Sequence, residues 1–270
     1  MIPSPVRYAR ASTLDEALEL LADPDAKAIA GGQSLLPVMK LRVARPSLVV
    51  DIGRLELGGV AVREGELHIG PLATWDELVR APELARPALA AIPECAAGIG
   101  DLQVRNRGTI GGSLAHADPA SDMPAVLIAL GARLHLRSPE GERTVAAGEF
   151  VVGPFTTALA TQELITDIVV PLPSSGSGSA YVAVEHPASG FALAGAAALA
   201  GVDGSRSITL TGIGAHPFAL AAADDPAATL DGTEIFGDRF ASAEYRRHLA
   251  GVVVARALER ALERAEEDRP

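Results

Sequence analysis

TIGGSLAHADPASD, residues 109–122, places two adjacent glycines after a β-branched pair and then adds two aspartates. A second stretch, AIAGGQSLLPVMKLR at residues 28–42, repeats the Gly-Gly pair and follows it with Gln and Ser. Glycine has no Cβ, so backbone N–H groups can approach a phosphate closely, and Ser, Thr or Gln side chains add neutral donors. The two stretches together indicate a ribose or pyrophosphate site.

Neither stretch matches the common nucleotide-binding fingerprints. The G-x-G-x-x-G pattern and the G-x-x-x-x-G-K pattern of a P-loop are both missing. Asp118 before Pro119 is also a good N-cap for a helix that we expect from Pro119 to about Gly131. Asp122 would lie in the first turns of that helix, where its charge suits the helix dipole. Two interpretations of these aspartates therefore stay open, a helix cap and a ligand of a hydroxyl group.

Composition limits the class of protein. The chain has 270 residues, 48% of them hydrophobic, which is enough for two or three packed units. Its net charge of −11 disfavours nucleic acid and anionic membranes as partners. The one cysteine, Cys95, excludes a disulfide framework, a structural zinc site or an iron–sulfur cluster built from this chain alone, and favours the cytoplasm. We find no signal peptide and no run long enough for a membrane span.

Hydrophobic periodicity predicts an α/β order followed by strands and a terminal helix. Ser/Thr-x-x-Glu capping boxes at residues 13–16 and 74–77 predict two helix starts. The segment PSSGSGSA, residues 173–180, is the best linker candidate, with a surface hairpin loop as the alternative. Three strand-like runs follow it, and an apolar stripe then predicts a long C-terminal helix.

AGGQSLLPVMKLR and NRGTIGGSLAHADPASDMPA closely resemble the two FAD-binding signatures of the flavoprotein (medium) subunit of molybdenum hydroxylases. This family includes aerobic carbon monoxide dehydrogenase and the xanthine dehydrogenases. The likeness extends over almost the whole chain, because the other elements fall in family order. It implies an α+β chain with an FAD-binding fold of the vanillyl-alcohol-oxidase (PCMH) type. Two α/β subdomains, residues 1–57 and 58–174, would hold FAD between them, and residues 175–270 would form a C-terminal α+β domain.

The resemblance also implies which residues bind FAD. The pyrophosphate and the inner part of the flavin would be lined by Ala30, Gly31, Gly32, Gln33, Ser34 and Leu35. The other side of the pyrophosphate would be held by Thr109, Ile110, Gly111, Gly112 and Ser113. Asp118 and Asp122 would lie toward the ribityl chain or the adenosine, and Leu164 and Ile165 would contact the adenine end through their backbone. Phe191 would cover a flavin face, with a place in the core as the alternative. No catalytic residue and no metal ligand is expected.

The sequence differs from similar flavoproteins at two places. Some flavoproteins of this fold attach FAD through a histidine in a Gly-Gly-His loop, but Gln33 stands there in this chain. An amide cannot form that bond, so we expect FAD to be non-covalent. Many relatives carry basic residues and a Gly-Asp-Tyr triplet near the flavin, where this chain has Glu185, Ser189 and Gly190. Loss of a nearby cation predicts a lower flavin potential or weaker stabilisation of the semiquinone than in relatives with a lysine there.

The resemblance implies a subunit that transfers electrons. The molybdenum cofactor would lie in a large molybdopterin-binding subunit, and a small subunit would carry two [2Fe–2S] clusters. FAD of this chain would pass their electrons to an external acceptor, in a dimer of heterotrimers (a heterohexamer). Two alternatives remain open at this point, a self-sufficient flavin oxidase or dehydrogenase of the same fold and an FAD-binding assembly partner without turnover.

Overall fold

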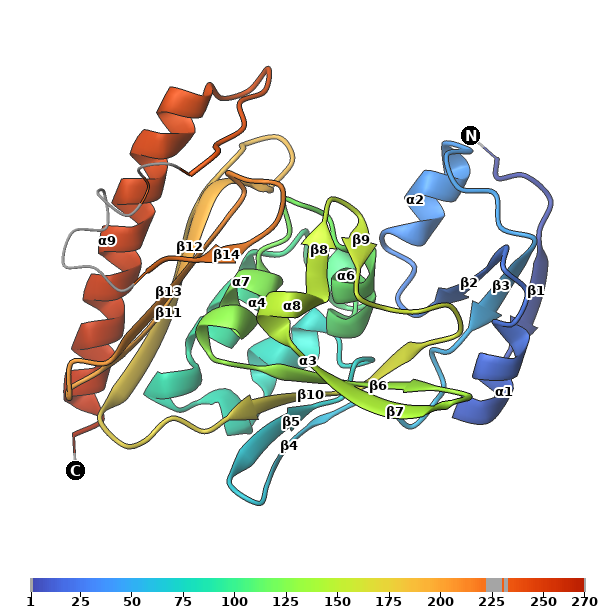
Figure 1. The fold of residues 1–270 in the computed structure, drawn as a ribbon, viewed down its shortest axis with the longest axis horizontal. Coiled ribbons are helices and arrows are strands. Elements are labelled where there is room, and N and C mark those ends of the chain that lie inside the picture. Colours follow the sequence, from blue (N-terminus) through green and yellow to red (C-terminus); the bar gives the residue numbers. More distant parts are fainter. Residues whose placement is uncertain (1, 222–229, 231–232, 270) are drawn as a thin grey trace.

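The computed structural model describes residues 2–221, 230 and 233–269, which form sheets of three, five and four strands and a short two-stranded ribbon (Figure 1). The three-stranded sheet lies at one end of the molecule and the four-stranded sheet at the other. Among the described residues, no helix combines the length and the apolar character needed to cross a membrane.

The first sheet is parallel, with the order β1-β3-β2. Its first helix begins at Thr13, whose side chain accepts from the N–H of Glu16. The predicted capping box is only half formed, because the Glu16 carboxylate accepts from the N–H of Ser12 instead of Thr13. The elements of this unit are β1 (Arg7–Arg10), α1 (Leu14–Leu20), β2 (Ala26–Ile29), α2 (Leu35–Lys40) and β3 (Leu48–Asp51).

The five-stranded sheet is antiparallel, with the order β4-β5-β10-β6-β7. Its strands are β4 (Val60–Arg63), β5 (Glu66–Ile69), β6 (Arg133–Ser138), β7 (Gly141–Ala146) and β10 (Leu164–Pro171). The elements between them are α3 (Trp75–Arg80), α4 (Ala91–Gly98), α5 (Leu102–Arg105), α6 (Ile110–His116), α7 (Met123–Ala129), α8 (Ala147–Phe150), β8 (Val151–Gly153) and β9 (Thr156–Thr157), with 3-10 turns at Pro82–Leu84 and Pro87–Leu89. The largest hydrophobic core lies between these helices and this sheet.

The start of α3 connects this unit to the second Gly-Gly pair. The predicted capping box of Thr74 and Glu77 is complete. Thr74 also forms an isolated bridge with Thr109, and the N–H of Trp75 donates to the carbonyl of Gly108 at 3.1 Å. The capping sequence therefore fixes the backbone immediately before residues 110–116.

The third sheet is antiparallel and is covered by one long helix. Its strands are β11 (Ser177–Glu185), β12 (Ala192–Gly201), β13 (Arg206–Thr211) and β14 (Phe218–Ala219), and α9 (Ala243–Glu267) packs on β11 and β12. The linker prediction for residues 173–180 is wrong at its second half, because residues 177–180 are buried and begin β11. A Cβ on Gly178 would lie 2.2 Å from the carbonyl oxygen of Ala261, so a small residue there allows α9 to approach the strand.

We propose that the chain divides into three units, after residues 57 and 174 as the sequence predicts, since each unit so defined contains one of the larger sheets.

Candidate cofactor-binding site

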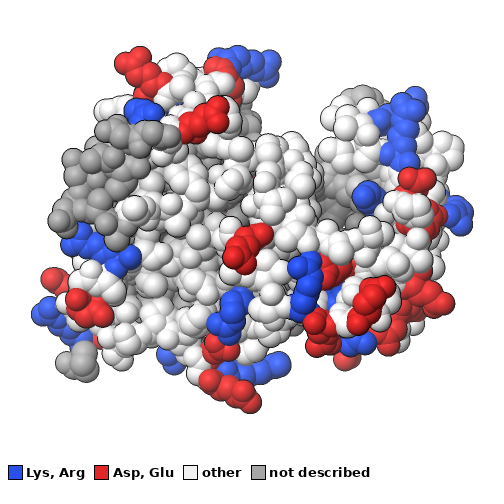
Figure 2. All heavy atoms as spheres, in the orientation of Figure 1, with Lys and Arg blue, Asp and Glu red and all other residues white. Residues whose placement is uncertain are grey.

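A cleft of about 810 Å³ lies between the first α/β unit and the helices around the second Gly-Gly pair. This volume falls within the range of about 300–1,000 Å³ that is usual for small-molecule and cofactor sites. All predicted FAD-binding residues line it except Ile110, whose side chain is fully buried in the core. Figure 2 shows an indented outline between the lobe that carries α2 and the centre of the molecule. In this view, charged side chains of both signs lie mainly near the edge of the molecule.

The first wall of the cleft is the loop of residues 30–35, between β2 and α2. Gly32 has a φ of +75°, which favours glycine, and a Cβ on Gly31 would lie 1.9 Å from the carbonyl oxygen of Arg107. Within the described residues, the backbone N–H groups of Gly31, Gly32, Gln33 and Ser34 donate to no protein acceptor. Several unused donors on the wall of one cavity provide a site for an anion.

The second wall differs from the expectation of a glycine loop, because both glycines lie inside α6. The N–H of Gly111 donates to the carbonyl of Pro71 at 2.8 Å, and the N–H of Gly112 donates to Thr109 Oγ1 at 3.2 Å. The N–H groups of Ile110 and Ser113 also have acceptors within the chain. A Cβ on Gly111 would lie 2.4 Å from the Pro71 Cβ, so this glycine is required for packing. The groups that this wall offers to a ligand are therefore mainly side-chain hydroxyls.

The aspartates do not cap a helix that starts at Pro119. Asp118 Oδ1 accepts from the N–H of Ala120 at 3.0 Å within a turn, and α7 begins only at Met123. The expected helix from Pro119 to about Gly131 is therefore shorter at both ends. The reason is that Ala117 ends α6 with a left-handed φ of 50°, so the chain turns before the next helix can start.

Asp122 is buried, with 8% of its surface exposed, so its interpretation as a solvated cap is wrong. It makes no capping bond with α7, and Tyr181 on β11 donates to its Oδ1 at 2.5 Å. The pKa of Asp122 is raised to about 6, mainly by burial and also by the charges of Glu185 and Asp118, while the Tyr181 hydrogen bond opposes the rise. This carboxylate is therefore a buried acceptor on the cleft wall.

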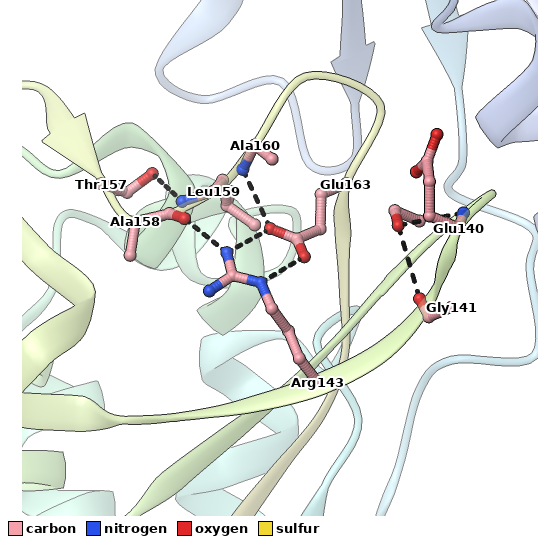
Figure 3. Close-up of polar contacts among 9 residues, drawn as sticks. Glu140, Gly141, Arg143, Thr157, Ala158, Leu159, Ala160 and Glu163 are labelled. Carbon is pink, nitrogen blue, oxygen red and sulfur yellow. Dashed lines mark hydrogen bonds and ion pairs between the residues drawn. The ribbon is translucent and has the colours of Figure 1, made fainter.

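A loop at residues 158–163, immediately before β10, closes one side of the cleft and is held from outside by Arg143 (Figure 3). The guanidinium of Arg143 donates to both oxygens of Glu163 at 2.7 Å and to the carbonyl of Ala158 at 2.6 Å. The carboxylate of Glu163 also accepts from the N–H of Ala160 at 2.9 Å. The Arg143 guanidinium holds the pKa of Glu163 below its usual range. This network fixes the loop that leads into Leu164 and Ile165.

Several cleft residues correct or extend the sequence predictions. Phe191 is 49% exposed at the cleft, so the alternative of a core position is wrong. Glu185 is exposed and does not line the cleft, although Ser189 and Gly190 do. The lining residues that sequence reasoning missed include Lys27, Trp75, His116, Ser121, Ala160, Thr161, Gln162 and Glu163. The position of residues 160–163 immediately before Leu164 was a usable signal, whereas nothing local points to Trp75.

Residues 4–173 match the family model described as the FAD binding domain in molybdopterin dehydrogenase. The chain belongs to this family. It is 35% identical to the carbon monoxide dehydrogenase medium chain of Afipia carboxidovorans, over 98% of this chain and 99% of that one. It is 38% identical to the nicotine 6-hydroxylase medium subunit of Paenarthrobacter nicotinovorans, over 87% and 83% of the two chains.

The family fold is also confirmed by a solved structure. A chain of the reconstituted carbon monoxide dehydrogenase from Oligotropha carboxidovorans superposes with a TM-score of 0.91 at 36% identity, covering 98% of this chain and 100% of that one. The predicted α+β fold of the PCMH type is therefore confirmed. The chain is an FAD-binding medium subunit of the molybdenum hydroxylase class, and thus part of an oxidoreductase.

The residues of the cleft fit FAD. The free N–H groups of the first wall suit a pyrophosphate, and the carboxylates of Asp118 and Asp122 can accept from ribityl or ribose hydroxyls. Apolar side chains such as Leu35 and Ile165 also line the cleft, as a ring system requires. Among the described lining residues, Lys27 is the one Lys or Arg, so phosphate binding depends mainly on the backbone.

Proposed function

We propose that this medium subunit transfers electrons from the two [2Fe–2S] clusters of a small partner subunit, through FAD, to an external acceptor. The substrate would be oxidised at the molybdenum cofactor of a large molybdopterin-binding subunit, in a cytoplasmic dimer of heterotrimers. With Cys95 as its one cysteine, this chain cannot supply the cluster ligands itself. The relatives are named as medium chains or subunits, which supports a role in a complex with further subunits.

The observation that carries the proposal is the set of free N–H groups at residues 31–34, opposite the hydroxyl-bearing second wall. Bound FAD would supply the redox chemistry, and the chain supplies binding and orientation. The backbone of the first wall would hold the pyrophosphate, while Thr109, Ser113 and Asp122 would hold the hydroxyl-bearing parts from the second. We also propose that FAD is bound non-covalently, because Gln33 offers no nucleophile to the ring.

Purification of the native complex tests this function. We expect a large and a small subunit, molybdenum, iron and one FAD for each copy of this chain. Absence of molybdenum and iron from an active complex would refute the electron-transfer role. Acid precipitation tests the mode of attachment, since all of the flavin should remain in the supernatant. Flavin that stays on the precipitated chain would contradict non-covalent binding.

A further inference from the structure

A buried tyrosine–carboxylate pair joins the third sheet to the cleft. Tyr181 and Asp122 are each 8% exposed, and the Tyr181 hydroxyl lies 2.5 Å from Asp122 Oδ1. This distance is at the short end of the range for a hydroxyl that donates to an ionised carboxylate. The geometry suits donation from the Tyr181 hydroxyl to the ionised form of Asp122.

The two oxygens of Asp122 have different surroundings. Asp122 lines the cleft whereas Tyr181 does not, so the hydrogen bond reaches the carboxylate from behind the wall. In the part of the chain that the structure describes, Oδ2 of Asp122 receives no hydrogen bond from a protein donor. One oxygen is thus held by Tyr181, and the other is left as an acceptor for a ligand in the cleft.

The elements packed around Asp122 bring no neutralising cation to it within the described residues. Their ionisable side chains are Asp118 in the preceding turn, Glu94 and Cys95 on α4, His116 on α6, Glu149 on α8, Tyr181 and Glu185 on β11, and Arg206 on β13. Arg206 lies at the end of β13 away from Thr211, whose hydroxyl donates to the Ser121 carbonyl, about 17 Å along the strand. The hydrogen bond from Tyr181 is therefore the main feature that favours the ionised form of Asp122.

We propose that Tyr181 is a positioning residue that keeps Asp122 ionised and oriented so that it accepts a hydrogen bond from a hydroxyl group of FAD, and that FAD affinity therefore depends on pH. The inference rests on the proposed function, since it requires FAD in this cleft. A hydrogen bond to an ionised acceptor is stronger than one to a neutral acceptor. FAD affinity should therefore fall by about tenfold as pH decreases through the titration of Asp122.

Fluorescence titration of the flavin-stripped full chain with FAD, between pH 5 and pH 8.5, tests the inference. The charges of the FAD pyrophosphate and ring stay constant over this range. We expect weaker binding below about pH 6 for the wild-type chain, and no such transition for Asp122→Asn. His116 also lines the cleft, but a positive charge on a histidine would favour an anion, which is the opposite sign. The variant His116→Gln should therefore keep the transition.

The variant Tyr181→Phe removes only the hydroxyl that bonds Asp122 and keeps the ring. It therefore separates the positioning of Asp122 by Tyr181 from the packing of the ring. Loss of the donor raises the pKa of Asp122, so the transition should move to higher pH, with weak binding at pH 7 and recovery at pH 8.5. A purely structural defect would weaken binding equally at every pH. Should Tyr181→Phe fail to fold, the titrations of wild type, Asp122→Asn and His116→Gln still decide whether FAD affinity depends on the ionisation of Asp122.

The two proposals fail in different ways. Tight FAD binding with one affinity from pH 5 to pH 8.5, or the same midpoint in Tyr181→Phe as in the wild type, would overturn the inference and leave the proposed function standing. Tighter binding at low pH in His116→Gln would also overturn it. Absence of FAD binding at every pH would overturn both.

Discussion

The two Gly-Gly pairs of this protein have the same sequence but different structural roles. At residues 31–32 the pair lies in a loop whose N–H groups have no protein acceptor among the described residues. At residues 111–112 the pair lies in a helix whose N–H groups are already bonded within the chain. The first wall of the cleft therefore provides donors, and the second provides a pre-organised surface of hydroxyls and carboxylates. A repeated motif does not indicate a repeated function of its backbone.

The largest expected effect concerns the contact between the two walls. Gly31→Ala places a Cβ 1.9 Å from the carbonyl oxygen of Arg107, so the walls must separate. We expect a loss of about 3 kcal/mol in the free energy of unfolding and loss of FAD binding, measured by urea denaturation and flavin titration. The control Gly148→Ala, whose Cβ would make an ordinary van der Waals contact with Ile128 Cγ2 at 3.9 Å, should change stability by less than about 1 kcal/mol. Equal behaviour of the two variants would contradict the close approach of the walls.

Arg143→Met tests whether the loop before Leu164, which closes one side of the cleft, is held from outside. It leaves the carboxylate of Glu163, 3% exposed, without its guanidinium partner. We expect a loss of about 2 kcal/mol in the free energy of unfolding at pH 7 and weaker FAD binding. The control Arg137→Met removes two pairs with exposed partners, Asp15 and Glu142, and should cost less than about 1 kcal/mol.

This effect of Arg143 should depend on pH. The folded-state pKa of Glu163 is lowered, so the stabilisation is present above the ordinary pKa of a glutamate, about 4.3. It is lost as pH falls through the lower folded-state pKa. The difference in stability between wild type and Arg143→Met should therefore shrink below about pH 4. A difference that stays constant from pH 7 to pH 3 would show that packing, and not the ion pair, is responsible.

Hydrogen exchange compares the backbone amides of the two Gly-Gly segments directly. Amides of residues 31–34 should exchange quickly in the flavin-free chain and at least about tenfold more slowly with FAD, equivalent to about 1.4 kcal/mol. Amides of residues 110–113 should be protected in both states, because their acceptors lie within the chain. Similar protection of both segments in the flavin-free chain would contradict the distinction between a first wall with free N–H groups and a second wall with bonded ones.

Thr109→Ala should have the smallest effect. It removes the acceptor of the Gly112 N–H, making the second wall slightly more like the first. Loss of an N-cap costs about 1 kcal/mol, which urea denaturation can measure, and exchange at Gly112 should increase. Thr109→Ser retains the hydroxyl and should restore both values. If Thr109→Ala leaves the Gly112 exchange rate unchanged, the cap does not protect this amide.

Local patterns predicted most of the fold, and long-range contacts account for what they missed. The capping box at Thr74 required only neighbouring residues. The helix at residues 110–116 was missed because Gly-Gly disfavours a helix unless tertiary packing, here against Pro71, compensates. The linker was misassigned because Gly178 contacts α9, far along the chain.

In the candidate site, too, local motifs were predicted and long-range contacts were missed. The sequence identified the lining of the cleft through its motifs, but the partner of Asp122 lies on another sheet, at Tyr181. No local pattern specifies that pairing. Arg143 was missed for a similar reason, because it reaches the loop from β7 without lining the cleft.

The strand that carries Tyr181 is itself secured by α9. Arg264 donates to the carbonyl of Ser179 at 2.7 Å and pairs with Glu94, whose carboxylate accepts from the N–H of Tyr181. During synthesis on the ribosome, both Gly-Gly motifs emerge long before this helix. The walls can then meet early, but the support behind Asp122 is completed only after the chain has been made through Arg264. If Tyr181 supports Asp122 as proposed, cofactor capture with full affinity would be a late, essentially post-translational event in the maturation of this subunit.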